Sequence, residues 1–172
     1  MKKMYGQFLL LAGLGFVQCS SKEKSPSPSN PIAANTAAVK IDGVAFPADM
    51  SRTVATISGS TGELWVTLAT KDAQGPRVTV RIPEFRKRTE VINPAAASKS
   101  RIELNGPLIH NVEGDFGSQY CGSVDRKFEI VEFDEARKTV SVKFSGSACG
   151  GPRLDKVKKI SEGQVNLSYV II

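Results

Sequence analysis

The sequence contains few of the side chains on which catalysis and metal binding most often depend. Its 172 residues include one histidine, His110, and three cysteines. A single histidine excludes metal sites built from several histidines, and it leaves one candidate base for a nucleophilic triad. No Gly-x-Ser-x-Gly motif occurs in the sequence. We therefore interpret His110 as a surface histidine in a loop.

Paired carboxylates and phosphate-binding loops are also missing in recognisable form. The nearest acid pairs are Glu113 with Asp115 and Asp134 with Glu135, and both pairs lie in turn-like sequence. Turns favour Asp because its carboxylate bonds to local backbone, so we assign these pairs to turns rather than to glycoside hydrolysis or calcium binding. Gly150-Gly151-Pro152 is typical of a turn. We expect no cofactor and no metal, and we expect that the protein is not an enzyme.

Positive charge is modest and lacks the pattern of a nucleic-acid site. The net charge of +6 falls to +4 without Lys2 and Lys3. Basic residues gather at Arg86, Lys87 and Arg88 and, more loosely, at Lys156, Lys158 and Lys159. Neither run contains interleaved aromatic residues, so we expect no nucleic-acid partner. We interpret both runs as solvated loops; the alternative is attraction to acidic lipid headgroups or cell-surface polysaccharide.

The longest apolar run is too short to remain in a membrane. It extends from Phe8 to Val17, follows Lys2 and Lys3, and stops at Cys19. A helix that spans a bilayer needs roughly 20 apolar residues, about twice the length of this run. The layout is that of a signal peptide, which we place at residues 1–18.

The segment Phe16-Val17-Gln18-Cys19 resembles the lipobox of bacterial lipoproteins. The usual pattern has Leu in place of Phe16 and a small residue in place of Gln18. The resemblance implies cleavage before Cys19 and acylation of its thiol and new amino group, with two or three acyl chains forming a durable tether. We expect a protein anchored in the bacterial cell envelope, at the outer membrane, facing the periplasm or the exterior. An ordinary secreted protein cut nearby is the alternative.

Residues 20–36 are rich in Ser, Pro, Asn and Lys, and they predict a flexible linker after the lipid-bearing cysteine. The folded domain is then expected over residues 37–172. Without Cys19, the remaining cysteines are Cys121 and Cys149. Two cysteines outside the cytoplasm favour a disulfide, although two buried thiols are the alternative.

The strongest predicted hairpin joins residues 124–133 to residues 137–145. Its register follows from side-chain matching near the turn, with Ile130 opposite Val140 and Phe128 opposite Val142. The same register brings Cys121 opposite Cys149, and this agreement favours the disulfide. Closure of that 28-residue interval stabilises the fold by about 3.5 kcal/mol in the chain-entropy model.

Alternating apolar residues predict an all-β domain. Strand patterns occur at residues 39–46, 53–57, 64–68, 78–82 and 165–171, in addition to the hairpin. Residues 86–117 are irregular and fit strands or loops equally well. The count indicates about eight or nine strands in an antiparallel β-sandwich or a barrel-like sheet.

Several turns and strand cores are similar to those of small uncharacterised β-sandwich lipoproteins of bacterial envelopes. The matching segments are Ile41–Phe46, Phe128–Ile130, Lys138–Phe144 and Ile160–Val165. The resemblance implies a β-sandwich fold and a location in the bacterial envelope, but it implies no activity. We expect a non-catalytic binding or structural module with a protein or polysaccharide partner. The alternatives are an inhibitor of an extracellular enzyme such as a protease, and a hydrolase with an unrecognised site.

Overall fold

The computed structural model describes residues 32–83, 100–106, 116–121, 126–150 and 155–172. These residues form ten β-strands and one short 3-10 helix, η2 (Ser118–Tyr120). The strands are β1 (Thr36–Ile41), β2 (Val44–Ala45), β3 (Val54–Ile57), β4 (Leu64–Ala69), β5 (Arg77–Ile82), β6 (Arg101–Asn105), β7 (Phe116–Gly117), β8 (Lys127–Asp134), β9 (Thr139–Gly150) and β10 (Lys156–Ile171). The prediction of an all-β domain is confirmed, with ten strands in place of eight or nine.

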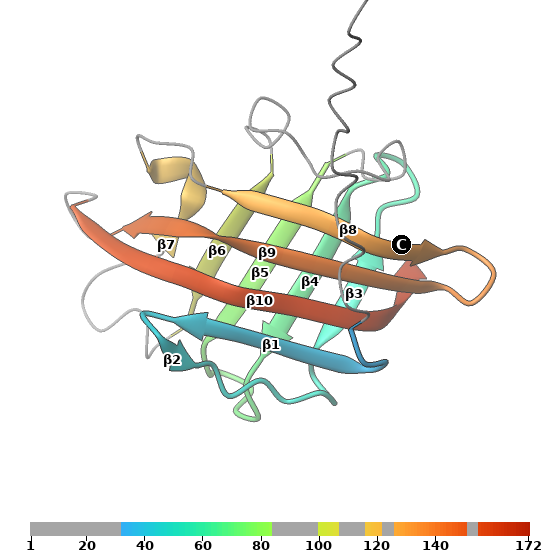
Figure 1. The fold of residues 1–172 in the computed structure, drawn as a ribbon, viewed down its shortest axis with the longest axis horizontal. Coiled ribbons are helices and arrows are strands. Elements are labelled where there is room, and N and C mark those ends of the chain that lie inside the picture. The colour runs from blue at the N-terminus through green and yellow to red at the C-terminus, as the bar shows by residue number, and fades with distance from the viewer. Residues whose placement is uncertain (1–31, 84–99, 107–115, 122–125, 151–154) are drawn as a thin grey trace, which may run out of the picture.

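The strands form two layers of one continuous sheet (Figure 1). The front layer holds β8, β9, β10, β1 and β2, and the back layer holds β3 to β7 in sequence order, with strands that cross those of the front layer steeply. The long strands β9 and β10, of 12 and 16 residues, reach both layers, because β9 also pairs with β7 and β10 also pairs with β3. This arrangement is a sandwich whose corners are made by strands shared between layers.

One strand pair departs from the predicted antiparallel pattern. Tyr169, Val170 and Ile171 at the end of β10 pair in parallel with β3. The sheet is therefore mixed, although every other pair is antiparallel. Apolar and polar residues alternate along a strand in the same way whether its neighbour is parallel or antiparallel. The sequence pattern therefore does not predict this parallel pairing.

The core lies between the layers and follows the predicted alternation closely in β5. Val78, Val80 and Ile82 are fully buried, whereas Arg81 and the other odd-numbered positions of β5 face outward. Each fully buried side chain of this kind contributes about 1.5–3 kcal/mol relative to an exposed one. In β10, Leu167 is buried as expected, but Ile171 at the strand end is 53% exposed.

The turn Asp42-Gly43 joins β1 to β2 as predicted. Both residues have positive φ, 52° for Asp42 and 81° for Gly43, which is the geometry of a tight hairpin turn. Pro47 follows soon after β2 and has no backbone N–H to continue a ladder. The second strand of this hairpin is therefore only two residues long.

The β8–β9 hairpin exists, but its predicted register is wrong. Ile130 faces Val142 and Phe128 faces Phe144, so each partner lies two residues further along β9 than expected. Two local features shift the register. The loop contains residues 135–138, with Lys138 at φ 54°, and β8 has a bulge at position 131.

The predicted disulfide between Cys121 and Cys149 is confirmed, and their Cα atoms are 5.1 Å apart. Its position in the fold differs from the prediction. Cys121 follows η2 rather than extending the line of β8, and Cys149 pairs in the sheet with Gly117 of β7 and Val157 of β10. The bond therefore fastens η2 to the end of β9 instead of closing the open end of the β8–β9 hairpin.

The described chain begins at Ile32, which is buried with 8% exposure. Its carbonyl oxygen accepts a hydrogen bond of 2.8 Å from Nδ2 of Asn166 on β10. Strand β1 begins at Thr36, one residue before the predicted start of the domain. The contact with Asn166 therefore fixes the entry of the chain onto the front layer.

Candidate functional site

A bulge in β10 sets the shape of the front layer. Against β9, Ile160 pairs with Gly146 and Gly163 pairs with Phe144, so β10 has one extra residue in this interval. Against β1 there is again one extra residue, between Ser161 and Gln164. Glu162 absorbs the excess with φ at 51°. A bulge that faces both neighbours bends the layer at this level.

Gly163 lies within the bulge and is covered by an aromatic ring. A Cβ atom at this position would lie 2.5 Å from Cδ2, Cε2 and the backbone carbonyl oxygen of Phe144, its partner on β9. No real Cβ contact is this short, so only glycine allows the ring to pack against the β10 backbone. The glycine and the phenylalanine therefore act as a pair.

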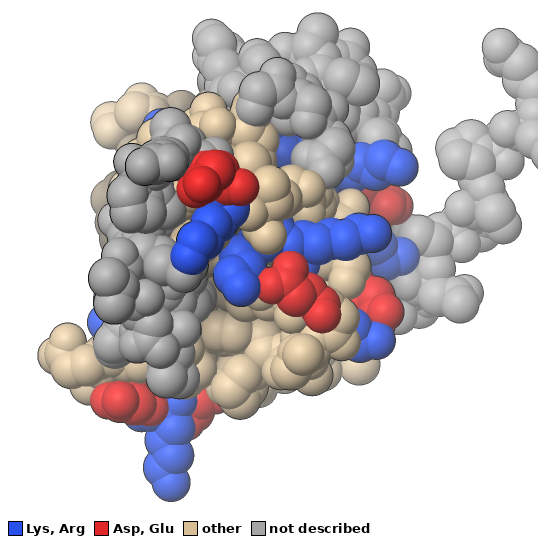
Figure 2. All heavy atoms as spheres, turned by 90° about the vertical axis from the view of Figure 1, so that its left-hand side faces the viewer, with Lys and Arg blue, Asp and Glu red and all other residues tan. Residues whose placement is uncertain are grey.

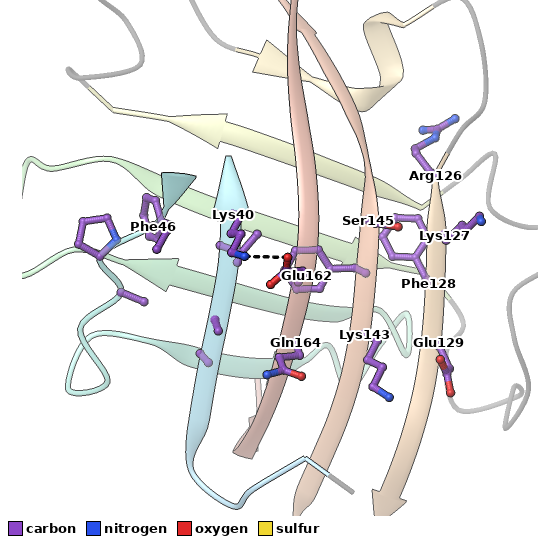
Figure 3. A pocket seen from close by; sticks show the side chains of 18 residues that line it. Lys40, Phe46, Arg126, Lys127, Phe128, Glu129, Lys143, Ser145, Glu162 and Gln164 are labelled. Carbon is purple, nitrogen blue, oxygen red and sulfur yellow. Dashed lines mark hydrogen bonds and ion pairs between the residues drawn. The ribbon is translucent and has the colours of Figure 1, made fainter. Parts of the chain in front are cut away.

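A groove of about 940 Å³ crosses the front layer at the level of the bulge (Figure 3). Its lining comes from the middle of β1, the bulge of β10, and the facing parts of β9 and β8. Small side chains leave room in it, namely Ala37, Ala38, Ala45 and Ala48, and Phe46 lies at the β1 side. The volume lies within the range of roughly 300–1,000 Å³ typical of small-molecule sites.

Cationic side chains outnumber acidic ones along the groove. The cations are Lys40, Arg126, Lys127 and Lys143, and the acids are Glu129 and Glu162. Nζ of Lys40 lies 2.7 Å from Oε1 of Glu162, so these two charges neutralise each other. Lys127 faces Ser145 in the ladder, and Lys143 faces Glu129. Neither Lys127 nor Lys143 forms an ion pair with another described residue.

Arg126 has a structural role at the β8 end of the groove. Its side chain is buried, and Nη1 donates a hydrogen bond of 2.9 Å to the carbonyl oxygen of Ser100 and a longer one of 3.4 Å to Oγ of Ser118. The Ser118 hydroxyl also accepts the backbone N–H of Ile102. Arg126 thus links the start of β8 to β6 and η2, and it keeps a fixed positive charge near the groove.

Next to the groove, Asp42 clamps the β1–β2 turn to β10. Burial raises the pKa of Asp42, but a 2.8 Å hydrogen bond from the Lys159 backbone N–H and the Lys158 ammonium at 3.0 Å outweigh it. The pKa of the carboxyl is therefore held below its ordinary value of 3.8. The clamp keeps β1, one wall of the groove, in register with β10.

The basic run Lys156, Lys158 and Lys159 was expected in a loop, and this expectation is wrong. These residues begin strand β10 and pair with the end of β9. Positive and negative side chains alternate on the side of the molecule shown in Figure 2. The ion pairs of Lys158 with Asp42 and of Lys40 with Glu162 are examples of this mixing in the fold.

Several candidate residues from the sequence lie outside the described residues. These are Cys19, Arg86, Lys87, Arg88, His110, Glu113 and Asp115. Asp134 and Glu135 are described and lie at the β8–β9 turn, where Oδ1 of Asp134 accepts the backbone N–H of Arg137 at 2.9 Å. Neither of these two acids lines the groove.

The described residues contain no group of three or more His, Cys, Asp or Glu side chains that could hold a metal ion. In the same part of the chain, no helix has the length and apolar character needed to cross a bilayer. The groove is thus the one feature described above that offers both space and chemistry for a ligand.

Sequence reasoning missed the groove, but a signal for it exists. Ile160 and Val165 are both buried although they lie an odd number of positions apart. On a regular strand, residues with this spacing point to opposite faces. The change of parity, together with Gly163 between the two residues, indicates a bulge in the terminal strand.

Comparison with known proteins adds no relative from which a site could be inferred. No family model matches the chain, and no curated protein or solved structure is significantly similar to it. The interpretation of the groove therefore depends on its own geometry and side chains.

Proposed function

We propose that the chain is a lipid-anchored, non-catalytic binding protein of the bacterial cell envelope whose groove holds a small ligand. The groove itself is the observation that supports the binding role. It combines about 940 Å³ of open volume with small apolar side chains and several cations. Specific polar groups around an apolar hollow are the usual composition of a ligand site.

The anchoring part of the proposal is supported by the sequence before the domain. Cys19 directly follows the predicted signal peptide, and a Ser- and Pro-rich segment separates it from Ile32. Fully extended, that segment spans roughly 45 Å. The lipid would hold the domain near a membrane while the groove remains accessible to molecules of the envelope.

Metabolic labelling with a radioactive fatty acid tests the anchor. The wild-type protein should carry label and fractionate with membranes, whereas Cys19→Ala should carry none and leave the membrane fraction. Recovery of the unlabelled wild-type protein from the cytosol at full length would contradict the proposal.

Native mass spectrometry of the protein purified from its envelope tests the binding role. The wild type should retain a non-covalent small-molecule adduct. Ala38→Trp places a large side chain in the groove and should remove the adduct. Ser168→Trp is the matched control, because Ser168 is an exposed residue of β10 that does not line the groove. Equal adducts in both variants would refute the groove as the binding site.

A further inference from the structure

We infer that the ligand of the groove is a single-chain amphiphile with an anionic headgroup, such as a fatty acid. This inference depends on the proposed binding function and names the ligand class of the same site. Three properties of the groove support it: its elongated course across the strands, its apolar end and its cationic end.

The groove is long in one direction because it crosses four neighbouring strands. Its lining comes from β1, β10, β9 and β8, which are consecutive in the sheet. Three spacings of roughly 4.8 Å each give a course of about 14 Å. An extended acyl chain of medium length fits such a course better than a compact ring system does.

The two ends of the groove differ in polarity (Figure 3). At the β1 end, Phe46, Pro47 and Ala48 provide apolar surface. At the β8 end lie Arg126, Lys127 and Lys143. An amphiphile would place its tail against the apolar end because burial removes hydrocarbon from water, and its headgroup at the cationic end.

Two of the three cations at the cationic end, Lys127 and Lys143, offer their charge to an anion, whereas Arg126 already binds Ser100 and Ser118. Glu162 is already engaged by Lys40 near the middle of the groove. Lys127 and Lys143 form no ion pair with another described residue, and the one carboxylate in this part of the lining, Glu129, lies opposite Lys143 in the ladder. Charge complementarity therefore favours a carboxylate headgroup over a neutral or cationic one.

Calorimetric titration of the full-length protein with three twelve-carbon amphiphiles, each below its critical micelle concentration, tests the inference. The probes are dodecanoate, 1-monododecanoylglycerol and dodecyltrimethylammonium. We expect dodecanoate to bind with the lowest Kd, about tenfold below that of the neutral probe. Equal Kd values for all three probes would overturn the choice of an anionic ligand and leave the binding function intact.

A charge reversal in the groove gives the matched comparison. In Lys127→Glu/Lys143→Glu the preference should turn toward dodecyltrimethylammonium. Lys71→Glu/Arg77→Glu makes the same change of net charge outside the groove and should retain the preference for dodecanoate. A loss of preference in both variants would show a response to net charge alone and would overturn the inference.

Failure of the inference can be separated from failure of the proposed function by Ala38→Trp. If dodecanoate binds the wild type and Ala38→Trp equally well, the groove is not the site, and both proposals fail. If Ala38→Trp weakens all three probes but headgroup charge has no effect, only the ligand class is wrong. Thermal unfolding of each variant verifies that it remains folded.

Discussion

At the scale of single residues, Gly163 is the position on which the shape of the groove depends most. The Phe144 ring occupies the space that a side chain would need, and the neighbouring Glu162 adopts a left-handed conformation. A ring laid across a glycine of the paired strand compensates for the missing side chain. The pair thus closes the sheet under the groove without filling the groove itself.

Gly163→Ala should destabilise the protein by about 1–3 kcal/mol, because the added methyl group clashes with both the ring and the backbone carbonyl oxygen of Phe144. The free energy of unfolding in urea measures this effect. Gly59→Ala is the control, since a Cβ at Gly59 would meet its nearest atoms at 3.4 and 3.5 Å. Equal losses in the two variants would contradict the packing described for Gly163.

The Asp42 clamp predicts a pH-dependent contribution to stability. Its pKa is lower in the folded protein than the ordinary value of 3.8, so its contribution is complete above that value and disappears as pH falls through the folded pKa. Asp42→Asn should therefore lower the unfolding free energy at about pH 5 to 8 and approach the wild type below about pH 4.

Urea unfolding of both proteins across this pH range gives the difference directly. Asp155→Asn, at an exposed position before β10, controls for the loss of one carboxylate. A difference between the wild type and Asp42→Asn that grows as the solution becomes more acidic would contradict the clamp.

At the scale of the elements, the disulfide joins η2 to β9 across 28 residues of chain. The prediction of this bond from the sequence was correct, whereas the register used to support it was wrong. Cys121 reaches Cys149 through the end of η2 and the short strand β7, neither of which has a clear signal in the sequence. The correct part of the disulfide prediction was the argument from the number of cysteines, and the argument from the hairpin register was wrong.

Reduction of the disulfide should lower the unfolding free energy by about 3.5 kcal/mol, because the unfolded chain regains the entropy of an open loop. Unfolding in denaturant with and without dithiothreitol measures the loss. The Cys121→Ser/Cys149→Ser variant should match the reduced wild type and should not respond to reductant. Two free thiols in the oxidised, denatured domain would contradict the bond.

Elements with strong local signals were predictable, and those set by their neighbours were not. The alternation of β5 and the Asp42-Gly43 turn are local properties, and the structure confirms both. The bulge of β10 depends on simultaneous pairing with β1 and β9. Its only trace in the sequence is the parity change between Ile160 and Val165. The groove follows from that bulge, so the candidate site could not be predicted from side-chain motifs.

At the scale of the whole molecule, two long strands hold both layers together. The number and spacing of apolar strands in the sequence predicted a sandwich. They did not predict that its two layers belong to one continuous sheet. It arises because β9 and β10 extend past the front layer and pair with β7 and β3. The groove lies on the strands that make both corners, so ligand binding there is expected to stabilise the entire fold.

Saturating dodecanoate should therefore raise the thermal unfolding temperature of the wild type in a concentration-dependent manner, as expected for a ligand that binds only the folded state. Ala38→Trp should show a much smaller increase at the same ligand concentration. A similar increase in both proteins would locate the binding outside the groove.

The most direct measurement of the central claim is a titration of the isotopically labelled protein with dodecanoate, followed by backbone amide chemical shifts. The account predicts that the largest shifts fall on groove residues 37–40, 126–129, 143–145 and 162–164. The amides of β4 and β5 in the back layer should change little. Shifts concentrated on the back layer, or no shifts at saturating dodecanoate, would contradict the account.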